Sequence, residues 1–388
     1  MTRLVCLEPA SPGPAWQPFA GARPIAELRA GAWRIRDRWA GMLGLEATVV
    51  MGNHVARFAD VDSAPVIPNG PVPGPAVVVR SDFAPSGRGF ALAAGVRRLT
   101  AGDATVAWIV PADETWEGPH ERGAAVPVDG LLLRGAWDLI TAVEHLLRAD
   151  CADALAAGPD PVPDGAIVLG DAGDVGCFGA SVEPGVVFDV RHGAVVLEDG
   201  VQVRSGTRLE GPLFAGPGSV LLGGAIRHSA IGPRCRVQGE LSTTVMLGYA
   251  NKSHDGFVGH SLIGQWVNLG AGTITSNLKN TYGEVRLDLP GGRLATGRMN
   301  LGTLFGDHAK TAIGTMLPTG CVIGAGANVA GGAAPKWVPP FSWGGSGEDS
   351  LDADGFVRVA KRVMPRRNVE VTPPIEASLR ALHARLAR

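Results

Sequence analysis

The chain has 388 residues, more than one hydrophobic core usually serves, so we expect two or more domains. Its formal net charge of −2 gives no electrostatic support for binding nucleic acid or an anionic membrane surface, and no apolar run of about eighteen residues predicts a membrane span. Gly (55) and Pro (29) are abundant, so we expect glycine to serve at tight corners of a folded chain.

The first part of the chain alternates short, Val-rich apolar runs with helix-like stretches. The runs are residues 4–7, 47–51, 76–80 and 105–110. This alternation is typical of an α/β domain with a mostly parallel sheet, which we assign to residues 1–160. A Pro-rich linker at 157–164 marks its end.

A basic segment at residues 23–39 lies between the first two runs. Its apolar residues recur at near-helical intervals, which predicts an amphipathic helix with a basic face. Two interpretations stay open: the basic face is solvated, or Arg23 and Arg29 point at a phosphorylated ligand near the carboxyl end of the first strand. Neither GxGxxG nor GxxxxGK[ST] follows that strand, so the usual backbone cradles for phosphate are absent.

From Asp164 the chain becomes periodic. Apolar residues recur six apart, and a small or β-branched residue often follows four positions later. The inward-facing set is Val182, Phe188, Leu197, Val203, Leu209, Phe214, Val220, Ile226, Ile231, Val237, Ile263, Leu269, Thr275, Leu317, Ile323 and Val329. Neither a helix nor simple strand alternation gives this period, whereas a parallel β-helix with triangular coils does, so we assign residues 161–345 to one. The alternative is a glycine-rich β-sandwich that matches by chance.

The remaining residues, 346–388, form a tail. Ile375, Leu379, Leu382 and Leu386 are spaced as on one side of a helix. Because a solenoid must cover its ends, we expect the N-terminal domain to cap one end and the tail to pack against the side or the other end.

The six-residue rhythm lapses at residues 248–260, which we predict to be a loop thrown out of one coil. His254 in this segment is the strongest candidate for a catalytic group, because imidazole accepts a proton near neutral pH. A lone histidine is more often structural, but Lys252 stands two residues before it and Gly256 permits an unusual backbone path. Glu240 is placed to orient such a base, and is equally well a surface carboxylate.

A second polar cluster holds Asp307, His308 and Lys310. Adjacent side chains of a strand face opposite ways, so joint metal ligation by Asp307 and His308 is not expected. No His or Cys partner stands at ligand spacing, and we predict no zinc site. His308 stays a second candidate beside the hypothesis that it bonds within an ordered loop.

The five cysteines are scattered and form no CxxC pair, which is typical of reduced thiols in a cytoplasmic protein. They are Cys6, Cys151, Cys177, Cys235 and Cys321. The N-terminus has no apolar stretch long enough for a signal peptide, and we expect a cytoplasmic location.

The hexapeptide array followed by NKSHDGFVGHSLIGQWVNLGAGTITSNLKNTYG resembles the acetyltransferase half of the bifunctional N-acetylglucosamine-1-phosphate uridylyltransferase and glucosamine-1-phosphate acetyltransferase. It resembles more closely a divergent branch of that family, the sugar nucleotidyltransferases with the signature RPxxELRxGxxxxRxxW, here at residues 23–39. The motifs GDHAK (306–310), FSWGG (341–345) and MPRR (364–367) are similar to that branch too. The resemblance implies a nucleotidyltransferase-like α/β domain, a left-handed parallel β-helix with a short helical tail, and a homotrimer with active sites between subunits.

The resemblance also implies roles for single residues. His254 matches the general base that takes a proton from the sugar amine, Glu240 a carboxylate of the acceptor pocket, and Asn268 an asparagine that contacts the acceptor. Residues expected to line the acetyl-CoA slot are Ala271, Thr315 and Ala325. Further candidates for binding substrate are Lys252, Asn277, Lys279, Arg23, Arg29 and His308.

Several positions depart from the family pattern. Phe257 replaces a tyrosine, Ser242 replaces a lysine that binds the sugar phosphate, and a second such lysine falls near Gly283. The N-terminal domain lacks the LxxGxGTRM-type loop and a clear Asp pair for Mg²⁺, with Asp82 and Asp103 as the remaining candidates.

We therefore predict a transferase that moves acetyl from acetyl-CoA to an amino-sugar phosphate, linked to a nucleotidyltransferase domain that uses UTP or another nucleoside triphosphate with Mg²⁺. One alternative makes nucleotidyl transfer the main activity and the β-helix a trimerisation and regulatory module. Another is a non-catalytic trimeric scaffold that binds a nucleotide sugar. The acceptor sugar and the base stay open.

Overall fold

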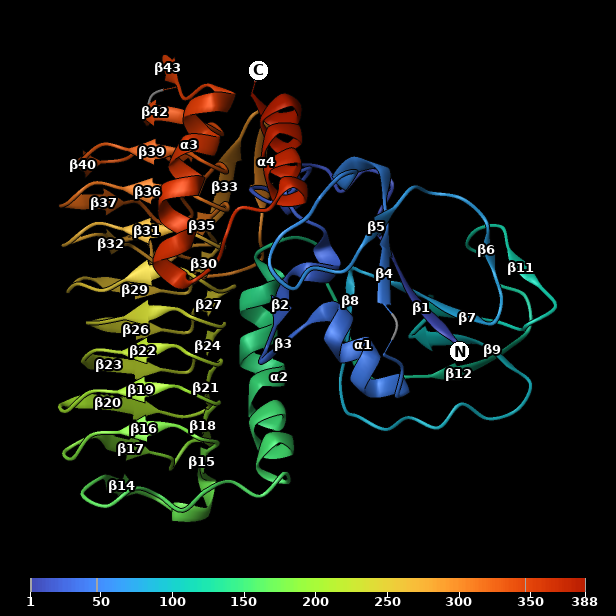
Figure 1. Ribbon diagram of the computed structural model, residues 1–388, viewed down its shortest axis with the longest axis horizontal. Coiled ribbons are helices and arrows are strands. Elements are labelled where there is room, and N and C mark those ends of the chain that lie inside the picture. Colours follow the sequence, from blue (N-terminus) through green and yellow to red (C-terminus); the bar gives the residue numbers. More distant parts are fainter. Residues whose placement is uncertain (1, 47, 346, 388) are drawn as a thin grey trace.

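The computed structural model describes residues 2–46, 48–345 and 347–387. An α/β domain lies beside a long β-helix, and two C-terminal helices lie against the far end of the coil and the domain (Figure 1). This confirms the predicted fold class: an α/β domain, a parallel β-helix and a helical tail. Among the described residues, no helix is both long and apolar enough to cross a membrane.

The N-terminal sheet has the strand order β12-β9-β10-β7-β1-β4-β5. β1 pairs in parallel with β4 and β7, whereas β10 runs antiparallel to β7 and β9. Its strands are β1 (Arg3–Leu7), β4 (Thr48–Met51), β5 (Val66–Ile67), β7 (Ala76–Arg80), β9 (Val96–Ala101), β10 (Ala104–Val110) and β12 (Ala124–Pro127). The four predicted runs are thus strands, although residue 47 lies outside the described part of the chain.

The predicted alternation with helices holds only once. Helix α1 (Ile35–Leu43) lies between β1 and β4, but the segments between β4 and β7 and between β7 and β10 contain strands and a 3₁₀ turn instead. Pro65, Pro68 and Pro71 explain part of this difference, because proline lacks the N–H that an α-helix interior requires.

The basic segment at 23–39 does not form one amphipathic helix. It folds as a 3₁₀ turn η2 (Ile25–Glu27), a tight hairpin of β2 (Arg29–Ala30) and β3 (Trp33–Arg34), and then α1. Gly31 makes the hairpin turn at φ 63°, where a Cβ would meet Asp150 and Arg38. The expected solvated face is therefore wrong, since Arg23 and Arg38 are buried.

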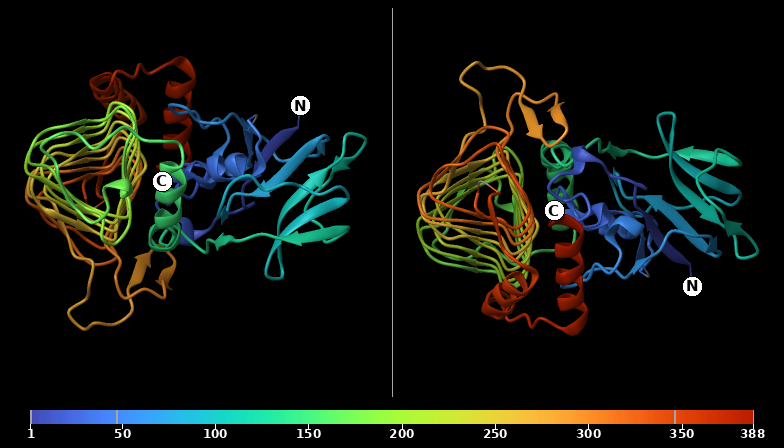
Figure 2. Two further views of the ribbon diagram at one scale, coloured as in Figure 1. Left: turned by 90° about the horizontal axis from the view of Figure 1, so that it is seen from below. Right: turned by 90° about the horizontal axis from the view of Figure 1, so that it is seen from above.

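The β-helix has three sides, each a ladder of short parallel strands (Figure 2). The α2 side, which packs against helix α2, has β15 (Val175–Cys177), β18 (Val195–Leu197), β21 (Leu213–Ala215), β24 (Ala230–Ile231), β27 (Val245–Met246), β30 (Leu262–Ile263), β35 (Leu304–Phe305), β38 (Val322–Ile323) and β41 (Trp337–Val338). The tail side has β16 (Ser181–Val182), β19 (Gln202–Val203), β22 (Val220–Leu221), β25 (Arg236–Val237), β28 (Asn251–Lys252), β31 (Asn268–Leu269), β36 (Lys310–Thr311), β39 (Asn328–Val329) and β42 (Ser342–Gly344). A last strand, β43 (Asp349–Ser350), is added antiparallel to β42. The third side has β14 (Ile167–Leu169), β17 (Val187–Asp189), β20 (Thr207–Glu210), β23 (Gly224–Arg227), β26 (Glu240–Ser242) and β29 (Phe257–Gly259), continued by β32 (Ile274–Thr275), β37 (Thr315–Leu317) and β40 (Gly332–Ala333).

Most predicted inward positions fill the interior of this prism, but the register slips by one residue at two of them. Ala215 and Leu221 pair with inward-facing Ile231 and Val237, and belong to the interior cluster. Their neighbours Phe214 and Val220 therefore face outward, because successive side chains of a strand alternate. Phe214 packs edge-on against Trp33 with ring centroids 5.0 Å apart.

Helix α2 (Asp138–Leu155) lies along the α2 side, between the coil and the N-terminal sheet (Figures 1 and 2). Outward residues of this side, such as Phe214 and Val245, share one hydrophobic cluster with Leu139 and Leu147 of α2 and with Leu4 of the sheet. The N-terminal domain therefore flanks the coil, and the expectation that it caps one end is wrong. The apolar residues that face outward along the α2 side favour this arrangement, because α2 and the N-terminal domain bury them.

The predicted loop at 248–260 is wrong as well. These residues contain β28 and β29 and follow the regular coil path. The excursion from the coil comes one turn later, between β32 and β35, where β33 (Arg286–Leu289) and β34 (Gly292–Ala295) form a hairpin. The rhythm lapses earlier because Lys252 occupies an inward position opposite Val237.

The tail forms α3 (Ala353–Val363), a 3₁₀ turn η5 (Met364–Arg367) and α4 (Pro373–Leu386). The side chain of Asp352 accepts from Gly355 N and caps α3. The predicted apolar side of the last helix is confirmed: Ile375, Leu379 and Leu382 are buried in a cluster with Phe341 and Phe356.

Candidate functional sites

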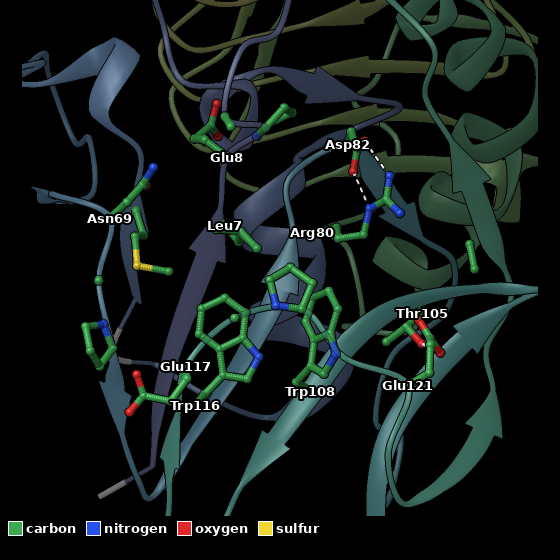
Figure 3. A pocket seen from close by; sticks show the side chains of 18 residues that line it. Leu7, Glu8, Asn69, Arg80, Asp82, Thr105, Trp108, Trp116, Glu117 and Glu121 are labelled. Atoms are coloured by element: carbon green, nitrogen blue, oxygen red, sulfur yellow. Dashed lines mark hydrogen bonds and ion pairs between the residues drawn. The ribbon is translucent and has the colours of Figure 1, made fainter.

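The first candidate site is a cavity of about 600 Å³ in the N-terminal domain (Figure 3). Its floor is formed where parallel strands end, by Leu7 of β1 and Glu8 directly after it, Met51 of β4, and Arg80 of β7. Open α/β sheets bind their ligands at this edge. The cavity thus lies at the edge where this type of sheet binds its ligands, although no glycine-rich loop follows β1.

Two tryptophans form one wall of this cavity. The rings of Trp108 and Trp116 lie 5.7 Å apart in a tilted arrangement. Trp108 Nε1 donates to His120 O at 2.8 Å, whereas Trp116 Nε1 is buried with no partner among the described residues. Flat indole faces beside an unused donor suit a planar ligand with acceptor atoms, such as a nucleobase.

Three carboxylates of the cavity, those of Glu8, Asp82 and Glu121, are already engaged. Asp82 receives two bonds from Arg80, at 2.8 and 2.7 Å (Figure 3). Glu8 accepts from the backbone N–H groups of Ile25 and Ala26. Asp103 is exposed and does not line the cavity.

These residues do not fit a preassembled magnesium site. No group of three or more His, Cys, Asp or Glu side chains within the described ranges is placed to hold a metal ion. Mg²⁺ takes octahedral oxygen ligands and often keeps substrate phosphates among them, so it would have to be brought by the ligand.

The second candidate site surrounds His254. This histidine is exposed in the turn between β28 and β29, at the corner that joins the tail side to the third side. The turn is stacked on the next coil, because Gly272 N donates to Asp255 O at 3.1 Å. Gly256 takes φ 136°, and a Cβ there would lie 2.3 Å from Thr273 O, so glycine is required for this path.

His254 lines a cavity of about 410 Å³ between the tail side and η5. The structure brings His254 and Asn268 together there, as expected for a base and an acceptor contact. Asn251 Nδ2 donates to Asn268 Oδ1 at 2.9 Å, which fixes the amide of Asn268. The lining residues are Arg236, Tyr249, Asn251, Ser253, His254, Trp266, Val267, Asn268, Lys310, Val363, Arg366 and Arg367.

Lys252 lies beneath the His254 turn rather than in the cavity. Its side chain is 2% exposed, and Nζ donates to Gln238 O at 2.6 Å and to His254 O at 2.9 Å. Burial lowers the pKa of Lys252 to about 8, although Asp255 and Glu240 oppose the shift. Lys252 is therefore placed to hold the turn and does not line the cavity.

Glu240, Asn277 and Lys279 lie elsewhere on the coil. Glu240 is on the third side, around the corner from the His254 cavity, and is paired with Arg227. Asn277 Nδ2 is 2.8 Å from His260 Nδ1, at the next corner of the coil. Lys279 Nζ donates to Glu284 O at 2.9 Å within the excursion.

The residues expected along the acetyl-CoA slot are not all at one place. Ala271 and Thr315 lie at the same corner as His254, one and two coils further on, since Gly314 N donates to Ala271 O at 2.8 Å. Ala325 is buried at a different corner, in the cluster beneath the tail helices.

Arg23 and His308 are buried where the three parts of the chain meet. Arg23 bonds Asp307 of the β-helix at 2.8 Å and Asp60 at 2.5 Å. His308 is stacked near Trp266 and edge-on to Phe356, and burial lowers its pKa well below the ordinary value. Neither side chain reaches the His254 cavity or the N-terminal cavity.

Arg29 is buried too, 5.8 Å from the ring of Phe214, and its guanidinium donates to Ala32 O. It therefore supports the hairpin against the coil instead of facing the strand ends of the N-terminal sheet.

The sequence interpretation missed the cationic residues of the His254 cavity. Arg236, Asn251, Asn268 and Lys310 are neighbours in register on the outward face of the tail side. Their signal was present in the repeat, because each directly precedes an inward position. The motif at 364–367 gave no indication that it would reach this face.

Part of the chain is similar to a known class of proteins. Residues 11–157 match the family described as sugar nucleotidyl transferase, so most of the N-terminal domain is similar to that class.

A curated relative supports the resemblance further. The chain is 32% identical over 149 residues to a bifunctional sugar-1-phosphate nucleotidylyltransferase/acetyltransferase of Sulfurisphaera tokodaii. The match covers 36% of this chain and 36% of the relative, so it spans about a third of that protein's length. Together the two findings confirm the similarity to a divergent branch of this family.

Proposed function

We propose that the chain is a sugar-phosphate transferase with two sites: acetyl transfer from acetyl-CoA to an amino-sugar phosphate at His254, and nucleotidyl transfer at the N-terminal cavity. The observation that carries acyl transfer is that His254 and Asn268 line one cavity whose charged side chains are cationic. Such a cavity suits an anionic acceptor, and His254 is its titratable base.

The acyl step follows from ordinary amine chemistry. An ammonium ion has no free electron pair, so it must lose a proton before it attacks a thioester. The His254 imidazole takes a proton from the nitrogen as the amine bonds to the acetyl carbonyl carbon, and the C–S bond breaks. The imidazolium then gives a proton to the sulfur, so that CoA leaves as thiol, and the other proton lost by the ammonium goes to water. Backbone N–H groups of the stacked coil corners are candidates for holding the intermediate oxyanion.

The N-terminal site is proposed from its position and from the family match. The cavity lies at the strand ends that bind ligands in such sheets, and the indoles of Trp108 and Trp116 offer a surface for a nucleobase. A nucleoside triphosphate such as UTP and a sugar 1-phosphate are the proposed substrates, and Mg²⁺ would enter with the nucleotide.

We also propose a cytoplasmic homotrimer. Ile274, Ile313 and Met316 are exposed at or next to the third side, and Ile274 pairs in register with Met316. Exposed apolar patches of this kind mark protein contacts. The molar mass in solution tests the proposal, with three times the 40.1 kDa of the chain expected.

One assay separates the candidate activities. The wild type is incubated with acetyl-CoA and a panel of amino-sugar phosphates, with CoA release followed by a thiol reagent, and with UTP and Mg²⁺, with pyrophosphate release followed. His254→Ala should lower CoA release about a hundredfold or more and leave pyrophosphate release unchanged, because the two cavities share no residue.

Unchanged CoA release in His254→Ala would rule out the proposed base. Pyrophosphate release without CoA release in the wild type would support nucleotidyl transfer as the main activity. Binding of a nucleotide sugar with neither product would leave the scaffold alternative.

A further inference from the structure

The lining of the His254 cavity includes three guanidinium groups. Arg236 comes from β25, and Arg366 and Arg367 come from η5, which lies across the tail side (Figure 1). Lys310 adds an ammonium group, which bonds only to His308 O within the described residues. Four cationic side chains thus face one volume.

These cations lack carboxylate partners. No ion pair among the described residues involves Arg236, Arg366, Arg367 or Lys310, and no carboxylate lines the cavity. Elsewhere on the β-helix, arginines on the third side are paired with carboxylates of the same side, as Arg227 is with Glu240 and Arg208 with Asp189. Uncompensated like charges repel, so this arrangement costs stability that an anionic ligand would recover.

The hydrogen bonds of Arg367 fix η5 against the β-helix. Its Nε donates to Arg234 O at 3.2 Å and its Nη2 to Asn251 Oδ1 at 3.3 Å. Burial, together with the nearby Arg236, lowers the pKa of Arg367. Arg367 therefore ties η5 to strand β28, next to the His254 turn, and sets Arg366 at the cavity rim.

We propose that Arg236, Arg366 and Arg367 form a phosphate subsite, which binds a phosphomonoester group of the ligand that reacts at His254. The proposal rests on acyl transfer at His254 and deepens it by naming how the anion is held. Planar guanidinium groups bind phosphate oxygens in pairs, and three of them suit a dianion. The subsite would also replace the two phosphate-binding lysines of the family pattern, whose positions are Ser242 and near Gly283 in this chain. Ser242 lies on the third side and Gly283 in the excursion, both outside this cavity.

The phosphate has two chemical sources, the amino-sugar phosphate and the 3′-phosphate of CoA. Titration calorimetry with glucosamine 1-phosphate against glucosamine, and with CoA against 3′-dephospho-CoA, distinguishes them. The variants are Arg236→Gln/Arg366→Gln and a matched control, Arg362→Gln. Arg362 is exposed in the last turn of α3, four residues before Arg366, and does not line the cavity.

In the wild type, the phosphorylated member of one pair should bind about tenfold or more tightly than its partner. That advantage should disappear in Arg236→Gln/Arg366→Gln and persist in Arg362→Gln. The pair that shows it identifies the source. An advantage that survives the double substitution, or no advantage in either pair, overturns the subsite.

This binding measurement is independent of turnover. A phosphate advantage that depends on the arginines, combined with unchanged CoA release in His254→Ala, would keep the subsite and reject the proposed base. Loss of CoA release in His254→Ala, together with a phosphate advantage that does not depend on the arginines, would support the proposed base and reject the subsite.

Discussion

Lys252 shows how one side chain shapes the His254 turn. The residues at the same inward position of the preceding and following coils, Val237 and Leu269, are apolar. The ammonium group of Lys252 is stabilised there because it donates hydrogen bonds to two backbone carbonyls. A buried ammonium is tolerated only with such partners. A neutral amine still has two N–H bonds for the two carbonyls, so the turn does not depend on the charge.

The lowered pKa of Lys252 predicts a pH dependence of stability. The unfolded state binds this proton up to about pH 10.4 and the folded state only up to about pH 8, so between these values the unfolded state binds more protons and stability rises with pH. Relative to Lys252→Met, the wild type should gain roughly 3 kcal/mol in free energy of unfolding over this range. Urea denaturation at pH 7, 8, 9 and 10 measures it, and parallel curves for the two proteins would contradict the burial of the charge.

At the scale of elements, the corner between the tail side and the third side carries the proposed acyl-transfer site. His254, Ala271 and Gly314 follow one another along it, one coil apart. The outward ladder Arg236, Asn251, Asn268 and Lys310 runs beside that corner. A repeated coil therefore aligns polar groups that are far apart in sequence, because every coil returns each side chain to the same face.

The apolar patch on the third side carries a prediction about assembly. Met316→Asp should convert the proposed trimer to monomers, because a carboxylate in an apolar subunit contact loses its hydration. Multi-angle light scattering measures the molar mass, with the 40.1 kDa of one chain expected for the variant. Ile167→Asp is a matched control, since Ile167 is similarly exposed, at 51% against 50%, but lies in the first coil. Trimers of Met316→Asp would show that the contact lies elsewhere.

At the scale of the whole molecule, a buried ionic cluster joins the parts of the chain. Arg23 of the N-terminal domain bonds Asp307 of the β-helix, and Asp307 Oδ1 accepts from Gln265 N at 2.8 Å. Nearby, Ala59 N donates to Ser378 Oγ of α4 at 2.9 Å. Domain, coil and tail are therefore fastened at one place.

Removal of Arg23 should destabilise the molecule strongly. Arg23→Met leaves Asp60 and Asp307 buried without their cation, which typically costs about 3–5 kcal/mol in free energy of unfolding. Arg97→Met should cost less than about 1 kcal/mol, because its pair with Glu114 is solvent-exposed. Chemical denaturation compares the two. Equal effects would show that the buried cluster contributes no more than a surface pair.

Much of the fold was readable from local pattern. The six-residue period predicted the β-helix, the Val-rich runs predicted the strands β1, β4, β7 and β10, and the spacing of Ile375, Leu379 and Leu382 predicted α4. These features depend on near neighbours in sequence. The outward orientation of Phe214 was not predictable in this way, because that phenylalanine packs against Trp33 of another domain.

The candidate site was only partly predictable for the same reason. Asn268 lies in the coil that follows the one with His254, so the repeat brings them near each other, and the resemblance assigned them. Arg366 and Arg367 join them from about a hundred residues further on, through a tail whose docking no local pattern encodes.

By itself, the sequence determined the repeat, the apolar interior and the residue types at the His254 turn, since each follows from spacing and side-chain chemistry. Only the tertiary structure decided that the N-terminal domain lies beside the coil, that Arg23 closes a buried junction, and that Lys252 holds the turn from below. It also decided which cations face His254. Those features depend on which surfaces meet, and contacts between distant segments are set by the burial and charge pairing of the whole chain.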